Sequence, residues 1–167
     1  MIDQILDDII ATEGGWTDHP ADRGGPTNWG ITLPTLTDYL GRPATVDDIR
    51  TLTVQDAKDI YRSLYIERPG FGAITDGKLL SLVVDMAVNH GVTRAIKLLQ
   101  RALRLDDDGI FGPKTKAALT TLSIRTTYLN LVAERIRFYG RIISKDHSQA
   151  VFASGWLNRA AKFVEIA

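Results

Sequence analysis

Residues 78–89 read KLLSLVVDMAVN, a segment that is apolar on nearly every side when it is wound into a helix. A helix that is hydrophobic all round is normally buried in the interior of a protein. We therefore expect this segment to form the central helix of the domain. Gly91 lies just beyond it and is expected to act as its C-cap.

Helical patterns of apolar residues lie on both sides of this central segment. Thr53 and Asp56 have the spacing of a capping box, with Asp in place of the usual Glu or Gln. No strong strand pattern appears, although residues 29–32 leave room for a short hairpin. The fold class that we predict is mostly α. Helices are expected over residues 2–12, 33–40, 45–49, 53–65, 93–105, 113–122, 124–143 and 155–164.

The composition excludes several classes of protein. The chain has 167 residues, of which 44% are hydrophobic and 24% charged. This balance is typical of a soluble globular protein with one domain, or with two small lobes that share a core. Cysteine is absent, so disulfides, thiol catalysis and Cys-based metal sites are excluded. No run of about 18 apolar residues occurs, so we expect no stable insertion into a membrane.

The charge of the chain is unevenly distributed. Residues 1–80 hold 7 Lys or Arg and 13 Asp or Glu, whereas residues 81–167 hold 13 and 7. Either the basic half faces an anionic polymer, or the two halves pair with each other. The opening residues, MIDQILDDII, lack the basic start and the cleavage site of a secretory signal. We therefore expect synthesis in the host cytoplasm, and release to the cell wall by another component.

Glu13 differs from the other three glutamates of the chain in its surroundings. It lies at the expected end of the first helix, is followed by two glycines and precedes Trp16 by about one turn. A carboxyl group that is held beside apolar rings favours its neutral form, which a general acid requires. The alternative is an ordinary glutamate before a glycine cap.

Asp22 and Thr27 follow Glu13 on the same Gly-rich loop. An acid, a second carboxylate and a hydroxyl suit inverting glycoside hydrolysis, because the acid protonates the leaving oxygen while the other two hold a water on the opposite face of the sugar. That route needs the two carboxyl groups about 6.5–9.5 Å apart. Asp18 is a rival for the second carboxylate, and turn formation is the alternative role for Asp22 and Thr27.

Residues 13–32, EGGWTDHPADRGGPTNWGIT, closely resemble the opening signature of glycoside hydrolase family 108. That family consists of bacterial and phage N-acetylmuramidases with a lysozyme-like fold. Its pattern is Glu-Gly-Gly followed by Asp-x-Gly-Gly-x-Thr-x-x-Gly-Ile-Thr. The resemblance implies that Glu13 is the catalytic acid. The order of acid, carboxylate and threonine also resembles that of phage-type lysozymes, although here one residue fewer separates Asp22 from Thr27.

The resemblance continues downstream. Residues 59–65, DIYRSLY, resemble a Tyr-containing helix of the family, and residues 85–91, DMAVNHG, resemble its central segment. Residues 94–167 are similar to the predicted peptidoglycan-binding region that accompanies this hydrolase. We therefore expect a lysozyme-like hydrolase lobe over residues 1–93 and a helical peptidoglycan-binding lobe over residues 94–167, packed into one globule.

Five further residues are candidates for substrate binding. Trp16, Trp29 and Tyr61 have rings that can stack on sugar faces, although aromatic residues also commonly pack in cores. Asn89 and His90 lie at the end of the central helix, where they can bond N-acetyl or hydroxyl groups; helix capping explains Asn89 equally well.

No metal or cofactor is expected. The run Asp106-Asp107-Asp108-Gly109 suggests a calcium loop at first glance. The twelfth position of such a loop needs Glu, and Ala117 stands there, so we reject a calcium site. A turn that links two helices is the expected role of this run.

The function that we predict is hydrolysis of the β-1,4 bond between N-acetylmuramic acid and N-acetylglucosamine in bacterial peptidoglycan. We expect a monomeric, lysozyme-type phage endolysin that is released through a holin and binds peptidoglycan glycan strands. One alternative is a lytic transglycosylase, which needs a single carboxyl group and forms an anhydro ring. Another is a non-catalytic cell-wall binding protein based on residues 94–167. A nucleic-acid partner is not expected, because no concentrated basic helix with exposed aromatic residues is present.

Overall fold

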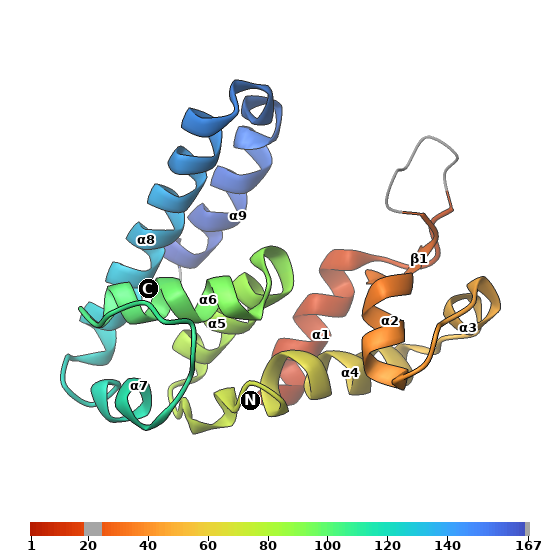
Figure 1. Ribbon diagram of the computed structural model, residues 1–167, viewed down its shortest axis with the longest axis horizontal. Helices are drawn as coiled ribbons and strands as arrows, with labels where there is room; N and C mark the ends of the chain where they lie inside the picture. Colours follow the sequence, from red (N-terminus) through yellow and green to blue (C-terminus); the bar gives the residue numbers. More distant parts are fainter. Residues whose placement is uncertain (19–24, 166–167) are drawn as a thin grey trace. The chain divides into compact units, whose positions relative to one another are not determined.

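The computed structural model describes residues 1–18 and 25–165, and the chain divides into two compact units, Met1–Pro69 and Gly70–Ala167. Each unit is built mainly of helices (Figure 1). A single two-stranded antiparallel hairpin is present among the described residues, and it belongs to the first unit. The predicted mostly α-helical fold with one small hairpin is therefore confirmed.

In the first unit, α1 (Ile2–Glu13) packs against α4 (Val54–Arg62). The apolar residues of α1 recur three and four positions apart, which places them on one face of the helix. The buried side chains of that face are Ile5, Leu6, Ile9 and Ile10. Two short helices, α2 (Leu33–Leu40) and α3 (Val46–Arg50), complete the unit together with the hairpin.

Side-chain caps fix where these helices begin. The Thr32 hydroxyl accepts a 3.3 Å hydrogen bond from the Thr35 amide and so caps α2. The predicted capping box of Thr53 and Asp56 is confirmed at the start of α4, and α3 has a second capping box. Each cap satisfies amide groups of the first turn that have no partner within the helix. The boundaries therefore follow from local sequence.

The segment after α4 differs from the continuous helix predicted over residues 53–65. Residues Ser63–Glu67 form a π-helical turn, closed by a 2.9 Å hydrogen bond from the Arg68 amide to the Ser63 carbonyl. Leu64 and Ile66, two positions apart, are both buried, at 6% and 1% exposure. Residues at that spacing do not share a face of an α-helix.

The second unit is built around α5 (Gly77–His90), which is the predicted central helix. Gly91 ends it with a φ of 83°, a conformation that glycine adopts without strain, so the expected C-cap is confirmed. Helix α6 (Val92–Ala102) packs against both α5 and α8 (Ile124–Lys145), and α8 packs against α9 (Ala153–Glu165) (Figure 1). The buried residues of α5 are Leu79, Leu80, Leu82, Val83, Val84, Met86 and Ala87.

Helix α7 (Pro113–Ala118) is shorter than the predicted helix over residues 113–122. The hydroxyls of Thr120 and Thr121 donate to the carbonyls of Ala117 and Ala118, at 2.9 and 2.7 Å. Such bonds compete with the helical pattern of the backbone, which ends here.

Three shorter elements complete the second unit. The 3₁₀ turns are Phe71–Ala73 and His147–Phe152, and the second of them precedes α9. The turn before α7 is held by Gln100, whose amide nitrogen donates to Asp108 at 2.7 Å and whose amide oxygen accepts from the Gly109 backbone at 2.9 Å. Among the helices of residues 1–18 and 25–165, none has both the length and the hydropathy to cross a membrane.

Candidate active site

The hairpin lies directly beyond the loop that follows Glu13. Strand β1 (Thr27–Asn28) pairs antiparallel with β2 (Ile31–Thr32), with Asn28 opposite Ile31. Trp29 and Gly30 form its two-residue turn, with φ angles of 54° and 76°. Positive φ at both central residues is the requirement of a type I′ turn, which matches the twist of the flanking strands. The sequence prediction of a short hairpin around these residues is confirmed.

Buried hydrogen bonds attach this turn to the segment after α3. The side-chain amide of Asn28, which is 5% exposed, donates to the carbonyls of Ile49 and Leu52 at 3.1 and 3.2 Å. The indole nitrogen of Trp29 donates to the same Leu52 carbonyl at 3.3 Å. Trp29 is therefore half-buried, and its polar edge is already used within the fold. Its sequence-based role in stacking on a sugar stays a prediction.

Gly30 brings the hairpin close to Glu13. A Cβ atom at Gly30 would lie 2.8 Å from the Glu13 Cβ and 2.6 Å from the Tyr61 hydroxyl. Only a residue without a side chain allows this approach, since real Cβ atoms do not come so near to other heavy atoms. The last residue of α1, the hairpin turn and α4 therefore meet at one point, with the half-buried Glu13 between them.

Tyr61 connects this point to the core. Its ring is 2% exposed, and its hydroxyl donates a 3.0 Å hydrogen bond to the Trp29 carbonyl. Sequence reasoning placed Tyr61 among the sugar-binding candidates. The structure buries the ring and uses the hydroxyl to hold the turn beside Glu13, so support of the site is the role that these contacts favour.

Tyr65 is a member of this cluster that sequence reasoning did not single out. Its ring centroid lies 5.7 Å from that of Tyr61. Burial raises the pKa of Tyr65, a hydrogen bond with Thr35 opposes that effect, and the charges of Asp38 and Glu13 add to it. The carboxyl group of Glu13 is thus one of the charges that act on Tyr65. The sequence signal that could have indicated Tyr65 is its four-residue spacing from Tyr61. The π-turn that positions Tyr65 has no clear pattern in the sequence.

The structure describes the two ends of the Gly-rich loop that follows Glu13. Thr17 and Thr27 form a bridge of two backbone hydrogen bonds, both of 2.8 Å, which closes the base of the loop. Thr27 is half-buried, and Asp18 is exposed. Asp22, the predicted second carboxylate, lies outside the described residues. Trp16 is 39% exposed, and the guanidinium of Arg50 lies 5.2 Å from the centre of its ring.

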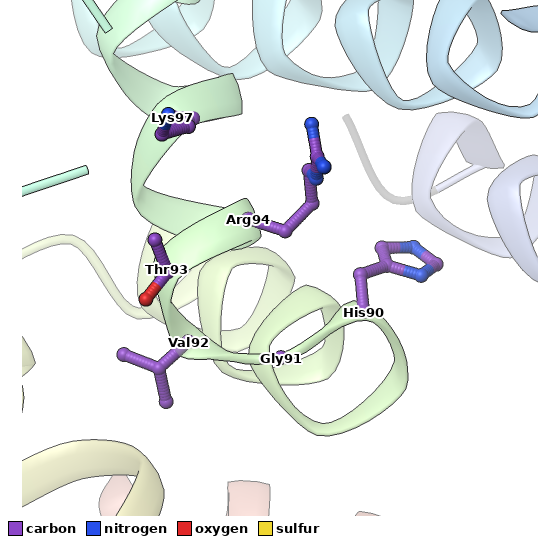
Figure 2. A pocket seen from close by; sticks show the side chains of 6 residues that line it. All are labelled: His90, Gly91, Val92, Thr93, Arg94 and Lys97. Atoms are coloured by element: carbon purple, nitrogen blue, oxygen red, sulfur yellow. The ribbon is translucent and has the colours of Figure 1, made fainter. Parts of the chain in front are cut away.

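Asn89 and His90, the remaining candidates, belong to the second unit. The side-chain amide of Asn89 donates to the Asp85 carbonyl one turn earlier within α5, at 2.6 Å, and its role in substrate binding stays a prediction. His90 lines a pocket of about 400 Å³ at the junction of α5 and α6 (Figure 2). The other lining residues are Gly91, Val92, Thr93, Arg94 and Lys97.

A buried ion cluster lies behind His90. The Asp85 carboxylate pairs with Arg135 at 2.6 Å and with Arg159 at 2.8 Å, and Arg135 is fully buried. Arg135 also donates from Nε to the Tyr139 hydroxyl at 2.8 Å, and that hydroxyl lies 3.3 Å from His90 Nε2. The Tyr139 oxygen accepts from Arg135, and its own hydrogen is available for donation to His90 Nε2.

The charge state of His90 agrees with this network. Burial and, to a lesser degree, the charge of Arg135 together lower the pKa of His90 to about 4, against smaller opposing effects of Asp85 and the Asn89 backbone. His90 is therefore neutral near pH 7. Within the part of the chain that the structure describes, no group of three His, Asp or Glu residues is arranged to hold a metal ion.

The comparisons with known proteins agree on both regions of the chain. Residues 6–91 match the family model of glycosyl hydrolase 108, and residues 94–161 match the model of a predicted peptidoglycan domain. The solved structure of SagA from Brucella abortus is 30% identical to the chain, with a TM-score of 0.84, over 97% of this chain and 90% of that one. No curated protein matches the chain. The fold is the mostly α-helical, lysozyme-like one that the sequence predicts.

Proposed function

The chain belongs to the glycosyl hydrolase 108 family and carries a peptidoglycan domain, so it is a glycoside hydrolase directed at peptidoglycan. From this premise we propose that it is an N-acetylmuramidase, which cleaves the β-1,4 bond between N-acetylmuramic acid and N-acetylglucosamine. The observation that carries the proposal is the position of Glu13 at the end of α1, packed against the Gly30 turn and beside two tyrosines.

Glu13 is the proposed general acid. It is the last residue of α1, and its Cβ and Cγ atoms lie against Gly30, which restricts the directions in which the carboxyl group can extend. A positioned acid of this kind protonates the leaving oxygen of the glycosidic bond as that bond breaks. Glu67, which is exposed in the π-turn, offers a control carboxylate in the same unit.

Asp22 and Thr27 are the proposed holders of the attacking water. Thr27 lies in strand β1, two residues before the turn that packs on Glu13. A second carboxylate on the loop before it completes the pair of groups that an inverting mechanism needs. Asp18 is the alternative carboxylate, and separate Asp22→Ala and Asp18→Ala variants distinguish the two.

The test is digestion of purified sacculi followed by mass spectrometry of the soluble fragments. Reducing, hydrated muramic acid ends are expected from the wild type and from Glu67→Gln. Glu13→Gln is expected to lose at least about 100-fold in rate, because general acid catalysis contributes about 10²–10⁴. Anhydro ends would instead identify a lytic transglycosylase, and the absence of any released fragments with new glycan ends would favour a wall-binding protein without catalysis.

The domain roles and the biological setting are separate parts of the proposal. We assign hydrolysis to residues 1–93 and wall contact to residues 94–167, in a monomer. We also propose that the protein is an endolysin of phage or prophage type that reaches the wall through a holin, a context suggested by the resemblance of residues 13–32 to a family of bacterial and phage N-acetylmuramidases. Detection of the protein in the periplasm of holin-free cells would contradict this setting.

A further inference from the structure

All the titratable residues that line the pocket at the junction of α5 and α6 are of basic types. His90, Arg94 and Lys97 supply these side chains, and none of the six lining residues is acidic. Its volume of about 400 Å³ lies within the range of about 300–1,000 Å³ that is usual for small-molecule sites. Figure 2 shows that the side chains of Arg94 and His90 lie on the same side of the backbone at Gly91.

Arg94 and Lys97 differ in whether nearby carboxylates interact with their positive charge. Within residues 1–18 and 25–165, its guanidinium forms no ion pair with a carboxylate and lies over the ring of Phe138, whose centre is 5.1 Å away. The charge of Lys97, in contrast, lowers the pKa values of Asp107 and Asp108 and is thus shared with the turn before α7. The positive charge available to a ligand is therefore that of Arg94.

The surroundings hold Arg94 in place without neutralising it. The His90 ring packs against Phe138 at 5.1 Å and against Tyr139 at 5.4 Å, and Tyr139 is fixed by the buried Arg135. The carboxylate of the buried ion cluster behind His90 is that of Asp85, and two arginines, Arg135 and Arg159, already share it. No ion pair joins Asp85 to Arg94 among the described residues, and the neutral His90 does not oppose a bound anion.

The backbone adds donors beside Arg94. Helix α6 begins at Val92 with no side-chain cap among the described residues, and its first helical hydrogen bond runs from the Ala95 amide to the Gly91 carbonyl. The amide groups of the preceding positions point out of the first turn, toward the same end of the helix that the pocket occupies. Such groups favour an anion when a cavity and a cation already select for one.

We propose that this pocket binds a carboxylate of the peptide that is attached to muramic acid, and so recognises peptidoglycan that carries its stem peptides. Sugars of the glycan backbone are largely neutral, whereas stem peptides carry free carboxylates. The planar fork of an arginine matches a carboxylate with two parallel hydrogen bonds. The ligand class rests on the proposed peptidoglycan function, while the charge and the cavity are independent of it.

The experiment is a titration of the intact protein with a purified disaccharide muropeptide, followed by amide NMR. This ligand ends in muramic acid and is a product of muramidase cleavage, so it is not consumed during the measurement. The matched ligand is the same muropeptide with its carboxyl groups amidated. The matched variants are Arg94→Gln and Arg125→Gln, since Arg125 is also an exposed arginine of the second unit.

Shift changes are expected at residues 90–97, with equal affinity in the wild type and Arg125→Gln. Arg94→Gln is expected to bind about tenfold more weakly, the size typical of a lost charge-assisted hydrogen bond. The amidated ligand should bind the wild type as weakly and should not respond to Arg94→Gln. All three proteins should have the same melting temperature, because Arg94 is exposed.

Two results would overturn the proposal. One is the absence of shift changes at residues 90–97 with the carboxylate-bearing muropeptide. The other is equal affinity for the two ligands, or for the wild type and Arg94→Gln. Because binding is measured without turnover, a failure of the muramidase proposal appears separately in the sacculus digestion, as the absence of new reducing ends.

Discussion

The hydroxyl of Tyr61 donates a 3.0 Å hydrogen bond to the carbonyl of Trp29, 32 positions earlier in the chain. This bond joins α4 to the hairpin turn that packs against Glu13. Tyr61→Phe keeps the buried ring and removes the hydroxyl. We expect a loss of about 1 kcal/mol in unfolding free energy, the usual cost of one hydrogen bond, and a clear loss of sacculus digestion. Urea unfolding and fragment release measure the two effects, and unchanged activity would show that the bond does not position the site.

Gly30 provides a second test of the same junction. Gly30→Ala forces a Cβ atom to within 2.6 Å of the Tyr61 hydroxyl and 2.8 Å of the Glu13 Cβ, in a residue with φ of +76°. Gly41→Ala is the matched control, because Gly41 has φ of +67° but a Cβ atom placed there would meet nothing within 4 Å among the described residues.

Both glycine variants carry the cost of positive φ, which is about 1 kcal/mol. We expect only Gly30→Ala to lose a further 1–3 kcal/mol, roughly the cost of overpacking, together with most of its activity. Thermal unfolding and sacculus digestion compare the two proteins. Equal losses in both variants would mean that the close approach to Glu13 is relaxed at little cost.

The buried ion cluster predicts unequal effects for its two partners. Asp85→Asn leaves the fully buried Arg135 without its carboxylate, and breaking a buried pair in this way costs about 3–5 kcal/mol. Arg135→Met is expected to cost less, because Asp85 then keeps its contact with Arg159 at 2.8 Å. Urea unfolding of the two single variants and the double variant tests this order. If Arg135→Met proves the more harmful change, packing of its long side chain outweighs the charge.

His90 predicts a pH dependence of stability. The pKa of His90 is lowered from 6.5 to about 4 in the folded state, mainly by burial. Between these values the unfolded chain binds the proton and the folded chain does not, so stability is complete above pH 6.5 and falls as the pH decreases toward 4. The loss amounts to at most about 3 kcal/mol.

His90→Gln removes this contribution, so its unfolding free energy should fall less than that of the wild type between pH 7 and pH 4. The exposed His147 offers the control, since His147→Gln should leave the wild-type slope in place. Urea unfolding at several pH values gives both slopes. Parallel curves for the wild type and His90→Gln would contradict the assignment of a neutral, internally bonded imidazole.

Much of the helical structure follows from interactions between near neighbours in sequence. The capping box of Thr53 and Asp56, the C-cap at Gly91 and the apolar face of α1 each depend on residues within one or two turns. Such signals are present in the sequence, and the structure confirms them. Predictions were wrong where hydrogen bonding changed within a continuous pattern, as at the π-turn Ser63–Glu67 and at the early end of α7.

The candidate site divides in the same way. Glu13, with two glycines after it, is visible in sequence because a helix end, a flexible loop and a carboxyl group are adjacent there. The packing of Gly30 on Glu13, the burial of Tyr61 and the proximity of Tyr65 arise from contacts between residues tens of positions apart. Local patterns carry no information about such distances. The sequence therefore predicts Glu13 as the acid and predicts the hairpin, whereas the tyrosine contacts around Glu13 depend on how α1, the hairpin and α4 pack together.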